Sequence, residues 1–534
     1  MAARHLLLLA LVCLHAPHQA SAQQPEEATV IVKGSAKIAQ TDVNYICATI
    51  DWWPPEKCNY NQCPWGQSSI LNLDLDHPFL AQVIQEFHNL RIRLGGSLQD
   101  RVVYGVGTNS PCSPFTNVSN GLFGFSAGCL SMDRWDKLND LFQKTGAVIT
   151  FGLNALHGRY NVQRSFWAGK WNSTNTYDFV KYTISKGYPI DSWEFGNELS
   201  GHGTGARVDA KLYGKDVTEL KSILRQLYRT PLSQPLLLAP GGFFDQQWYT
   251  QLLQTSGHGV VNALTHHIYN LGGGDDVHLM RKIVDPKYLD RAEDTYRDMQ
   301  LTLQRHGTWA SSWVSESGGV FNNGRQLVSN TFMNSIWYLD QLGMASKYNT
   351  KVFCRQTLIG GNYGLLDKQT FLPNPDYYSA LLWHRLMGNG VLSVDINAPR
   401  KLRAYAHCSK RHERNHYPPD QPKQQHRVQR DSPERPQRER REKKRRPPEA
   451  RRRAQESGLV AGKQAVEREH EEGRVPSDRQ GRRPPEQDDA AQWRPAGAGR
   501  RRHQRPGHEP GARRRGFAGA PGPDVDCLRG PAKV

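Results

Sequence analysis

Short apolar runs that end on glycine, asparagine, aspartate or glutamate recur through the N-terminal three-quarters of the chain. Short apolar runs bounded by loop residues are typical of buried strands, and helical patterns separate them here. Strands that alternate with helices predict parallel βαβ units, and eight such units close a (β/α)8 barrel. The sequence therefore predicts an α/β protein with a TIM barrel over residues 46–400. The expected strands cover residues 46–50, 91–94, 148–151, 192–198, 236–238, 263–269, 313–315 and 351–358.

The two ends of the chain differ from this pattern. Residues 23–45 contain alternating apolar positions that predict N-terminal strands outside the barrel. Residues 409–534 carry 33 lysine and arginine residues against 19 acidic ones, whereas residues 1–408 carry 36 against 32, so most of the net charge of +18 lies in this low-complexity basic tail. Its composition predicts disorder. One interpretation is a tail attracted to polyanions or a membrane surface, without specific nucleic-acid recognition. The other is an uninformative segment, such as out-of-frame translation of GC-rich sequence.

Residues 1–22 have the features of a secretory signal peptide. Arg4 precedes an apolar run over residues 6–14, and an Ala-Ser-Ala cleavage pattern follows. The apolar run is too short to anchor the chain across a bilayer. We expect secretion to the cell exterior or wall, or delivery to a lysosome or vacuole. We also expect glycosylation at the sequons that begin at Asn117 and Asn172.

Secretion makes the cysteines candidates for disulfides. Cys58 with Cys63, and Cys112 with Cys129, each lie in one loop-rich segment, so these two pairings are plausible. The full connectivity cannot be deduced from the sequence. The cysteines have no CxxC pair or matching histidine spacing for a zinc site, and the sequence indicates no metal ion or organic cofactor.

Two strand ends carry glutamates in similar surroundings. The runs that end in Gly196-Asn197-Glu198 and in Ser315-Glu316 are both followed by serine and glycine, and the glutamates lie 118 positions apart. In a parallel barrel, both strand ends open at the same mouth. A retaining glycosidase needs one carboxyl group as acid/base and a second as nucleophile, about 5–5.5 Å apart. The pair predicts cleavage of a glycosidic bond; the alternative is that each glutamate is only a structural ion-pair partner.

Neighbouring residues favour the catalytic interpretation. The Asn197 amide suits a hydrogen bond to a sugar hydroxyl, and His267 and Tyr269 face the same side of one strand. Tyr269 is placed to donate a hydrogen bond that keeps the second glutamate ionised. Glu194 shares the face of the first catalytic candidate but lies deeper in the barrel, where we expect a buried ion pair with Arg93.

Several motifs follow one another in a fixed order along the chain. They are Arg93-Leu94-Gly95-Gly96-Ser97, Phe151-Gly152-Leu153-Asn154-Ala155-Leu156, Ser185-Lys186-Gly187-Tyr188, Trp193-Glu194-Phe195-Gly196-Asn197-Glu198, His266-His267-Ile268-Tyr269, Arg355-Gln356, Gly360-Gly361-Asn362-Tyr363 and Pro375-Asp376-Tyr377. With these motifs the chain resembles heparanase and the plant heparanase-like proteins of glycoside hydrolase family 79. The likeness runs from about residue 51 to residue 406.

The resemblance implies a role for individual residues. Glu198 would be the acid/base and Glu316 the nucleophile of a retaining β-glucuronidase. The backbone at Gly361 and the Tyr363 hydroxyl would hold the glucuronate carboxylate, because such donors suit an anion. The residues that would line the glucuronate subsite are Asp51, Ser97, Asn197, His267, Tyr269, Gln356, Gly361 and Tyr363.

Two departures from the family pattern affect the expected product. Family members carry a C-terminal β-sandwich joined by an N-terminal strand, whereas here the likeness ends near Cys408 and the basic tail follows. We therefore expect the strands at residues 28–38 to lack their sheet, with unpaired edges and exposed apolar surface. In animal heparanase a longer segment at this place is excised to make a heterodimer, so the short segment 105–132 predicts a single-chain enzyme, which we expect to be a monomer. The sequence thus predicts a secreted β-glucuronidase acting on proteoglycan or small glucuronides; the alternative is an inactive relative that binds carbohydrate or polyanions.

Overall fold

The computed structural model describes residues 27–107, 112–230 and 234–410. The predicted signal peptide and all of the basic tail beyond residue 410 lie outside these residues, so the expectations for them stay predictions. Along the part of the chain that is described, no helix combines the length and the apolar character needed to cross a bilayer.

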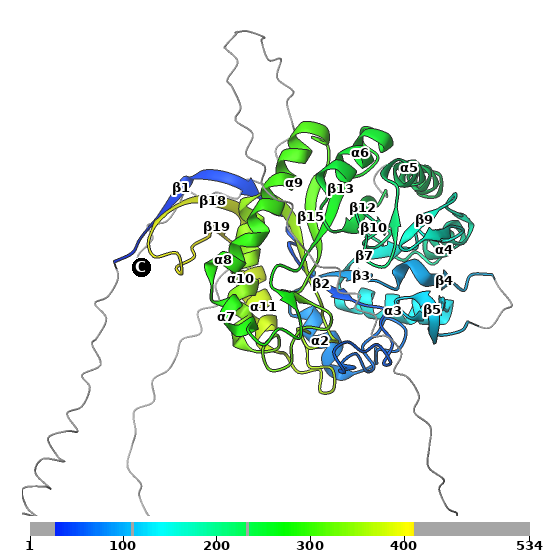
Figure 1. Cartoon of the computed structure of the whole chain (residues 1–534), viewed down its shortest axis with the longest axis horizontal. Helices are drawn as coiled ribbons and strands as arrows, with labels where there is room; N and C mark the ends of the chain where they lie inside the picture. The colour runs from blue at the N-terminus through cyan, green and yellow to red at the C-terminus, as the bar shows by residue number, and fades with distance from the viewer. Residues whose placement is uncertain (1–26, 108–111, 231–233, 411–534) are drawn as a thin grey trace, which may run out of the picture. The chain divides into compact units, whose positions relative to one another are not determined.

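Eight parallel strands form a closed barrel (Figure 1), and each corresponds to a strand predicted from the sequence. β17 pairs with β2, so the last barrel strand closes against the first. The predicted (β/α)8 fold is confirmed. The strands are β2 (Ile46–Ile50), β3 (Arg91–Leu94), β7 (Val148–Leu153), β10 (Ser192–Phe195), β12 (Leu236–Gly242), β13 (Ala263–Ile268), β15 (Ser311–Ser317) and β17 (Thr350–Arg355).

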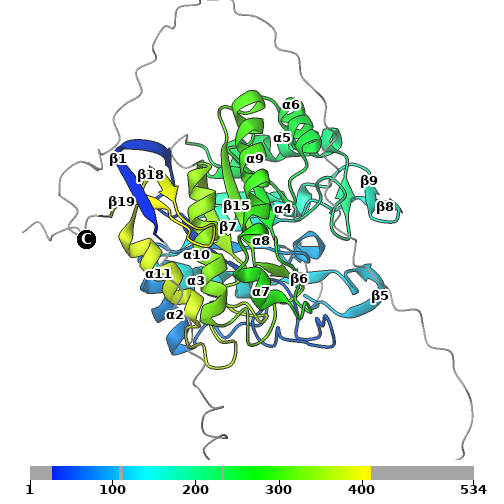
Figure 2. The same ribbon diagram turned by 60° about the vertical axis from the view of Figure 1, so that its left-hand side comes forward.

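Helices surround the barrel (Figures 1 and 2). In α3, the Ser131 side chain accepts a hydrogen bond from the Arg134 amide at 3.2 Å, and Gly146 ends the helix with a φ of 69°. Trp135 and Phe142 lie on its buried face. The helices are α2 (Pro78–Gln85), α3 (Met132–Thr145), α4 (Thr174–Ser185), α5 (Ala210–Leu227), α6 (Gln246–Ser256), α7 (Leu279–Ile283), α8 (Pro286–Leu289), α9 (Glu293–His306), α10 (Phe332–Lys347) and α11 (Pro375–Leu386).

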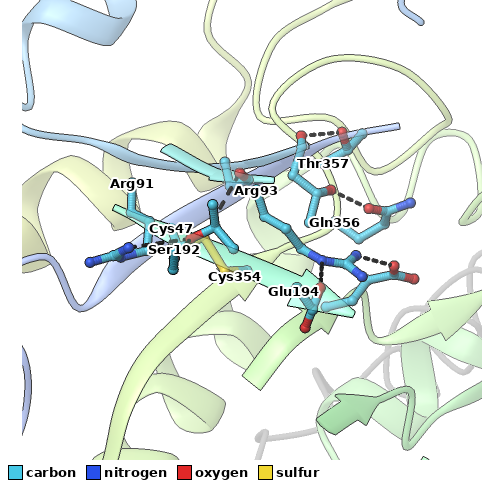
Figure 3. The surroundings of a disulfide bond; sticks show 12 residues. Cys47, Arg91, Arg93, Ser192, Glu194, Cys354, Gln356 and Thr357 are labelled. Carbon is cyan, nitrogen blue, oxygen red and sulfur yellow. Dashed lines mark hydrogen bonds and ion pairs between the residues drawn. A yellow bond between two sulfur atoms is a disulfide. The ribbon is translucent and has the colours of Figure 1, made fainter. Parts of the chain in front are cut away.

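The barrel interior combines a disulfide with polar side chains (Figure 3). Cys47 on β2 and Cys354 on β17 are bonded to each other, and 307 positions of sequence separate them. Beside them, Arg91 donates to Thr150 at 3.2 Å, and Thr150 is hydrogen-bonded to Ser192 at 2.7 Å. The sequence did not predict the disulfide across the barrel, but both of the loop disulfides that it made plausible are present.

β1 (Thr29–Gln40) forms an antiparallel sheet with β18 (Met387–Asn397) and β19 (Ala406–Ser409), next to α10 and α11 (Figures 1 and 2). The expectation that the N-terminal strand would lack its sheet is therefore wrong. Its partner is β18, in a segment that the sequence analysis assigned to the barrel. β1 still forms an edge of this sheet, and the expected exposed apolar surface is found there: Ile31 is 54% exposed and Ile396 is 43% exposed.

Candidate active site

Glu198 lies just beyond the end of β10, in a backbone conformation that is rare for its residue type. Its φ is 54°, in the left-handed region, and that of Gly196 is 71°. Such a conformation costs a residue with a side chain about 1–2 kcal/mol. Two hydrogen bonds stabilise it: the Glu198 amide donates to the Gly241 carbonyl at 2.7 Å, and the Thr204 amide donates to the Glu198 carbonyl at 3.1 Å. The sequence placed Glu198 at the strand end, but not in this turned conformation.

Glu316 lies within β15, and its two carboxylate oxygens accept from different donors. The Tyr269 hydroxyl donates to one oxygen at 2.7 Å, as predicted, and Arg93 donates to the other at 2.8 Å. Burial acts to raise the pKa of Glu316, but His267, Arg93 and Tyr269 together bring it below its usual value. Glu316 is therefore held as a carboxylate, the state that a nucleophile requires.

The two glutamates face each other across His267. His267 Nδ1 lies 2.9 Å from Glu198 Oε1. A ring nitrogen of His267 and one carboxylate oxygen from each glutamate all lie within 4.8 Å of one another. This separation is close to the roughly 5–5.5 Å of retaining glycosidases. The same three groups are close enough to hold a metal ion, but Arg93 already places a positive charge against Glu316, and that charge opposes a second cation.

Arg93 organises the floor of the site, a role that the sequence analysis did not assign. Its fully buried guanidinium donates to Glu194 at 2.6 Å, to Glu316 at 2.8 Å and to Asn197 Oδ1 at 2.8 Å. The predicted ion pair with Glu194 is confirmed (Figure 3). Because Asn197 Oδ1 accepts from Arg93, the amide can offer its NH2 group to a sugar. Its backbone amide donates to Asp100 at 2.8 Å, which fixes the loop.

Asp51 lies beside the nucleophile and is fully enclosed. It accepts hydrogen bonds from the Gln356 side chain at 2.8 Å and from the Trp52 amide at 2.6 Å. Burial and the nearby charge of Glu316 raise its pKa to about 7. A Cβ at Gly96 would lie 2.5 Å from the Asp51 oxygens, so the close approach requires glycine there. At mildly acidic pH, Asp51 therefore carries a proton.

The remaining predicted subsite residues lie around this carboxyl group. Tyr363 is buried with its ring against Trp65 at 6.3 Å between centroids, and burial and the nearby carboxylates raise the pKa of its hydroxyl. Gly361 has a φ of 64°, and a Cβ there would lie 2.7 Å from the Tyr363 ring. Ser97 is half-buried directly after Gly96. Their contacts with substrate stay predictions.

Both predicted glycosylation sites are accessible. Asn117 is exposed at the start of β5 (Asn117–Leu122), and Asn172 is exposed shortly before α4. Exposure is what attachment of a glycan requires, so the geometry permits modification at either site.

A barrel whose mouth holds one ionised glutamate within reach of a second, histidine-bound glutamate has the machinery of a glycoside hydrolase. The model of glycosyl hydrolase family 79, N-terminal domain, matches residues 27–343. The chain belongs to this family, and a retaining mechanism is consistent with that membership.

Individual relatives agree with the family match. Heparanase-like protein 1 of Arabidopsis thaliana is 58% identical over 396 residues, which cover 74% of this chain and 73% of the relative. Baicalin-beta-D-glucuronidase of Scutellaria baicalensis is 43% identical over 401 residues, covering 72% and 76%. The structure of the alpha-L-arabinofuranosidase from Thermotoga maritima has a TM-score of 0.51 at 13% identity, over 70% of this chain and 76% of that one, and this likeness shows the fold alone.

Proposed function

We propose that the chain is a secreted retaining β-glucuronidase that releases β-linked glucuronic acid from small glucuronides or proteoglycan. The observation that carries this proposal is the placement of oxygens of Glu198 and Glu316 within 4.8 Å of each other, with Glu316 held ionised. At this separation one carboxylate can attack the anomeric carbon directly, and no room is left for an intervening water.

The reaction follows from the hydrogen bonds on each glutamate. Glu316 attacks the anomeric carbon while Glu198 gives its proton to the glycosidic oxygen, so the aglycone leaves as an alcohol and a glucuronyl ester forms on Glu316. Glu198, now a carboxylate beside His267, takes a proton from water as the water attacks the ester and restores Glu316. Arg93 and Tyr269 stabilise the charge on Glu316 as it changes during the reaction. They need not move, because both are buried and already donate hydrogen bonds to Glu316.

Glucuronate selectivity would come from donors that are not themselves charged. The Gly361 backbone and the Tyr363 hydroxyl would bind the carboxylate, while Asp51 in its protonated form would donate to a sugar hydroxyl. A neutral site of this kind supports an acidic sugar without the cost of a buried unpaired cation.

Secretion is the second part of the proposal. It rests on the N-terminal signal pattern and on two exposed sequons. The disulfides support it as well, because such bonds persist in oxidising compartments.

The proposal is tested by the hydrolysis of aryl β-glucuronides at mildly acidic pH. Glu316→Gln should abolish turnover of every substrate, because it removes the nucleophile. Glu198→Gln should lose turnover of a phenyl glucuronide but retain the first step with a dinitrophenyl glucuronide, whose leaving group needs no proton. The burst of dinitrophenol from the second variant is the matched control for folding. An equal loss of activity toward both substrates in both variants, or full activity in Glu316→Gln, would contradict the assignment.

A further inference from the structure

An aromatic ring at the mouth of the barrel has no part in the mechanism above. Phe243 directly follows β12, and its half-buried ring lies 6.2 Å from the His267 ring in an edge-on arrangement and 6.4 Å from the Tyr269 ring. His267 is hydrogen-bonded to Glu198, and the Tyr269 hydroxyl donates to Glu316. The Phe243 ring therefore borders the reacting centre.

The backbone ties Phe243 firmly to the acid/base. The Glu198 amide donates to the Gly241 carbonyl at 2.7 Å, and the Ser200 hydroxyl donates to the Phe243 carbonyl at 2.9 Å. A Cβ at Gly242 would lie 2.5 Å from that hydroxyl and 3.2 Å from Glu198 Cα, so the two strand ends pack backbone to backbone. The backbone that carries the ring is thus held in place relative to the group that protonates the leaving oxygen.

The chain segment that carries Phe243 has no basic side chain that could bind an anionic sugar. Residues 234–257, which contain β12, Phe243 and α6, include no lysine, arginine or histidine. The single acidic residue of the segment is Asp245, which accepts a hydrogen bond from the Trp248 amide at the start of α6. Sulfated or carboxylated sugars are bound by arginine and lysine, and this segment offers neither.

We propose that Phe243 forms the leaving-group subsite and takes a planar, uncharged aromatic aglycone, such as a flavone, rather than an anionic sugar of a polysaccharide. This inference rests on the proposed function, because the acid/base defines the side on which the aglycone departs. Aromatic rings pair by offset stacking or edge contact, and one such pair changes an equilibrium by about two- to tenfold beyond the effect of buried area.

The test compares substrate selectivity rather than activity alone. For the wild type, Phe243→Ala and Phe244→Ala, kcat/KM is measured with a flavone 7-O-glucuronide and with methyl β-glucuronide, and the ratio of the two values is formed. The intrinsic difference between the leaving groups cancels when these ratios are compared. Phe244 is the matched control because it is the neighbouring phenylalanine and its ring packs on Tyr249 of α6, 5.1 Å away.

The subsite predicts that the flavone-to-methyl ratio falls about five- to tenfold in Phe243→Ala and stays within about twofold in Phe244→Ala. Phe243→Trp should keep the wild-type ratio. An unchanged ratio in Phe243→Ala overturns the inference, and so does an equal loss with both substrates, which would mean that the ring only supports His267 and Tyr269. Preference of the wild type for a glucuronyl-glucosamine disaccharide also overturns it. In all three cases the β-glucuronidase function stands, whereas a wild type that cleaves no glucuronide refutes both.

Discussion

Removal of Arg93 should lower both the stability of the barrel and its catalytic activity. The guanidinium is fully buried and forms ion pairs with both Glu194 and Glu316. Arg93→Met keeps an unbranched side chain but leaves two carboxylates buried without their cation. Breaking a buried ion pair by removing one partner costs about 3–5 kcal/mol of unfolding free energy. We expect a loss of this size, measured by urea unfolding.

The same substitution should impair the nucleophile. Arg93 is one of the groups that lower the pKa of Glu316, so without it the carboxylate ionises at higher pH. The variant also loses a hydrogen bond to a charged group, worth about 1.5–3 kcal/mol, which corresponds to roughly 10- to 100-fold in kcat/KM if the bond is needed in the transition state. The acidic limb of the kcat/KM profile should move to higher pH in the variant.

A double variant distinguishes the two effects. Arg93→Met with Glu194→Met removes one of the stranded carboxylates, so much of the lost stability should return. Activity should stay low, because Glu316 still lacks its donor. If the double variant regains wild-type kcat/KM together with its stability, Arg93 acts only through the fold and the reasoning is refuted.

Three further predictions use other parts of the structure. Replacing Cys47 and Cys354 together by alanine should lower the unfolding free energy by about 5 kcal/mol, because the bond closes a very long loop; a loss no larger than that from removing the five-residue loop disulfide would contradict this. Burial raises the pKa of Asp51 and of Asp100 from 3.8 to about 7, so the folded state keeps protons that the unfolded state releases. Stability should therefore fall as pH rises through that window, and a Tm higher at pH 8 than at pH 5 is incompatible with it. Tyr269→Phe should lower kcat/KM by about tenfold with an unchanged circular dichroism spectrum, and full activity would exclude its hydrogen bond from catalysis.

The barrel was predictable because the information for each strand is local. Every barrel strand is a short apolar run that ends on loop residues, and the structure places a strand at each of them. The positions of Glu198 and Glu316 followed from the same signal, since strand ends in a parallel barrel converge. The hydrogen bond from Tyr269 to Glu316 could be anticipated because neighbouring strands bring their ends together.

Features formed by residues that are far apart in the sequence could not be predicted from local patterns. The disulfide between Cys47 and Cys354 depends on closure of the barrel, which brings together positions 307 apart. The partner strand of β1 lies beyond the last barrel helix, and its apolar run does not itself reveal which sheet it joins. The triple role of Arg93 depends on side chains from two segments that are far apart in the sequence, the end of β10 and β15.

The central claim is that Glu316 forms a covalent bond to glucuronic acid, and trapping of that bond tests it most directly. A 2-deoxy-2-fluoro-β-glucuronyl fluoride should inactivate the enzyme with release of fluoride, because the fluorine at C2 slows hydrolysis of the ester more than its formation. Mass spectrometry of the digested protein should then find one added fluoroglucuronyl group on the peptide that contains Glu316. A label on Glu198 instead, or a product of inverted anomeric configuration with no label, would contradict the account.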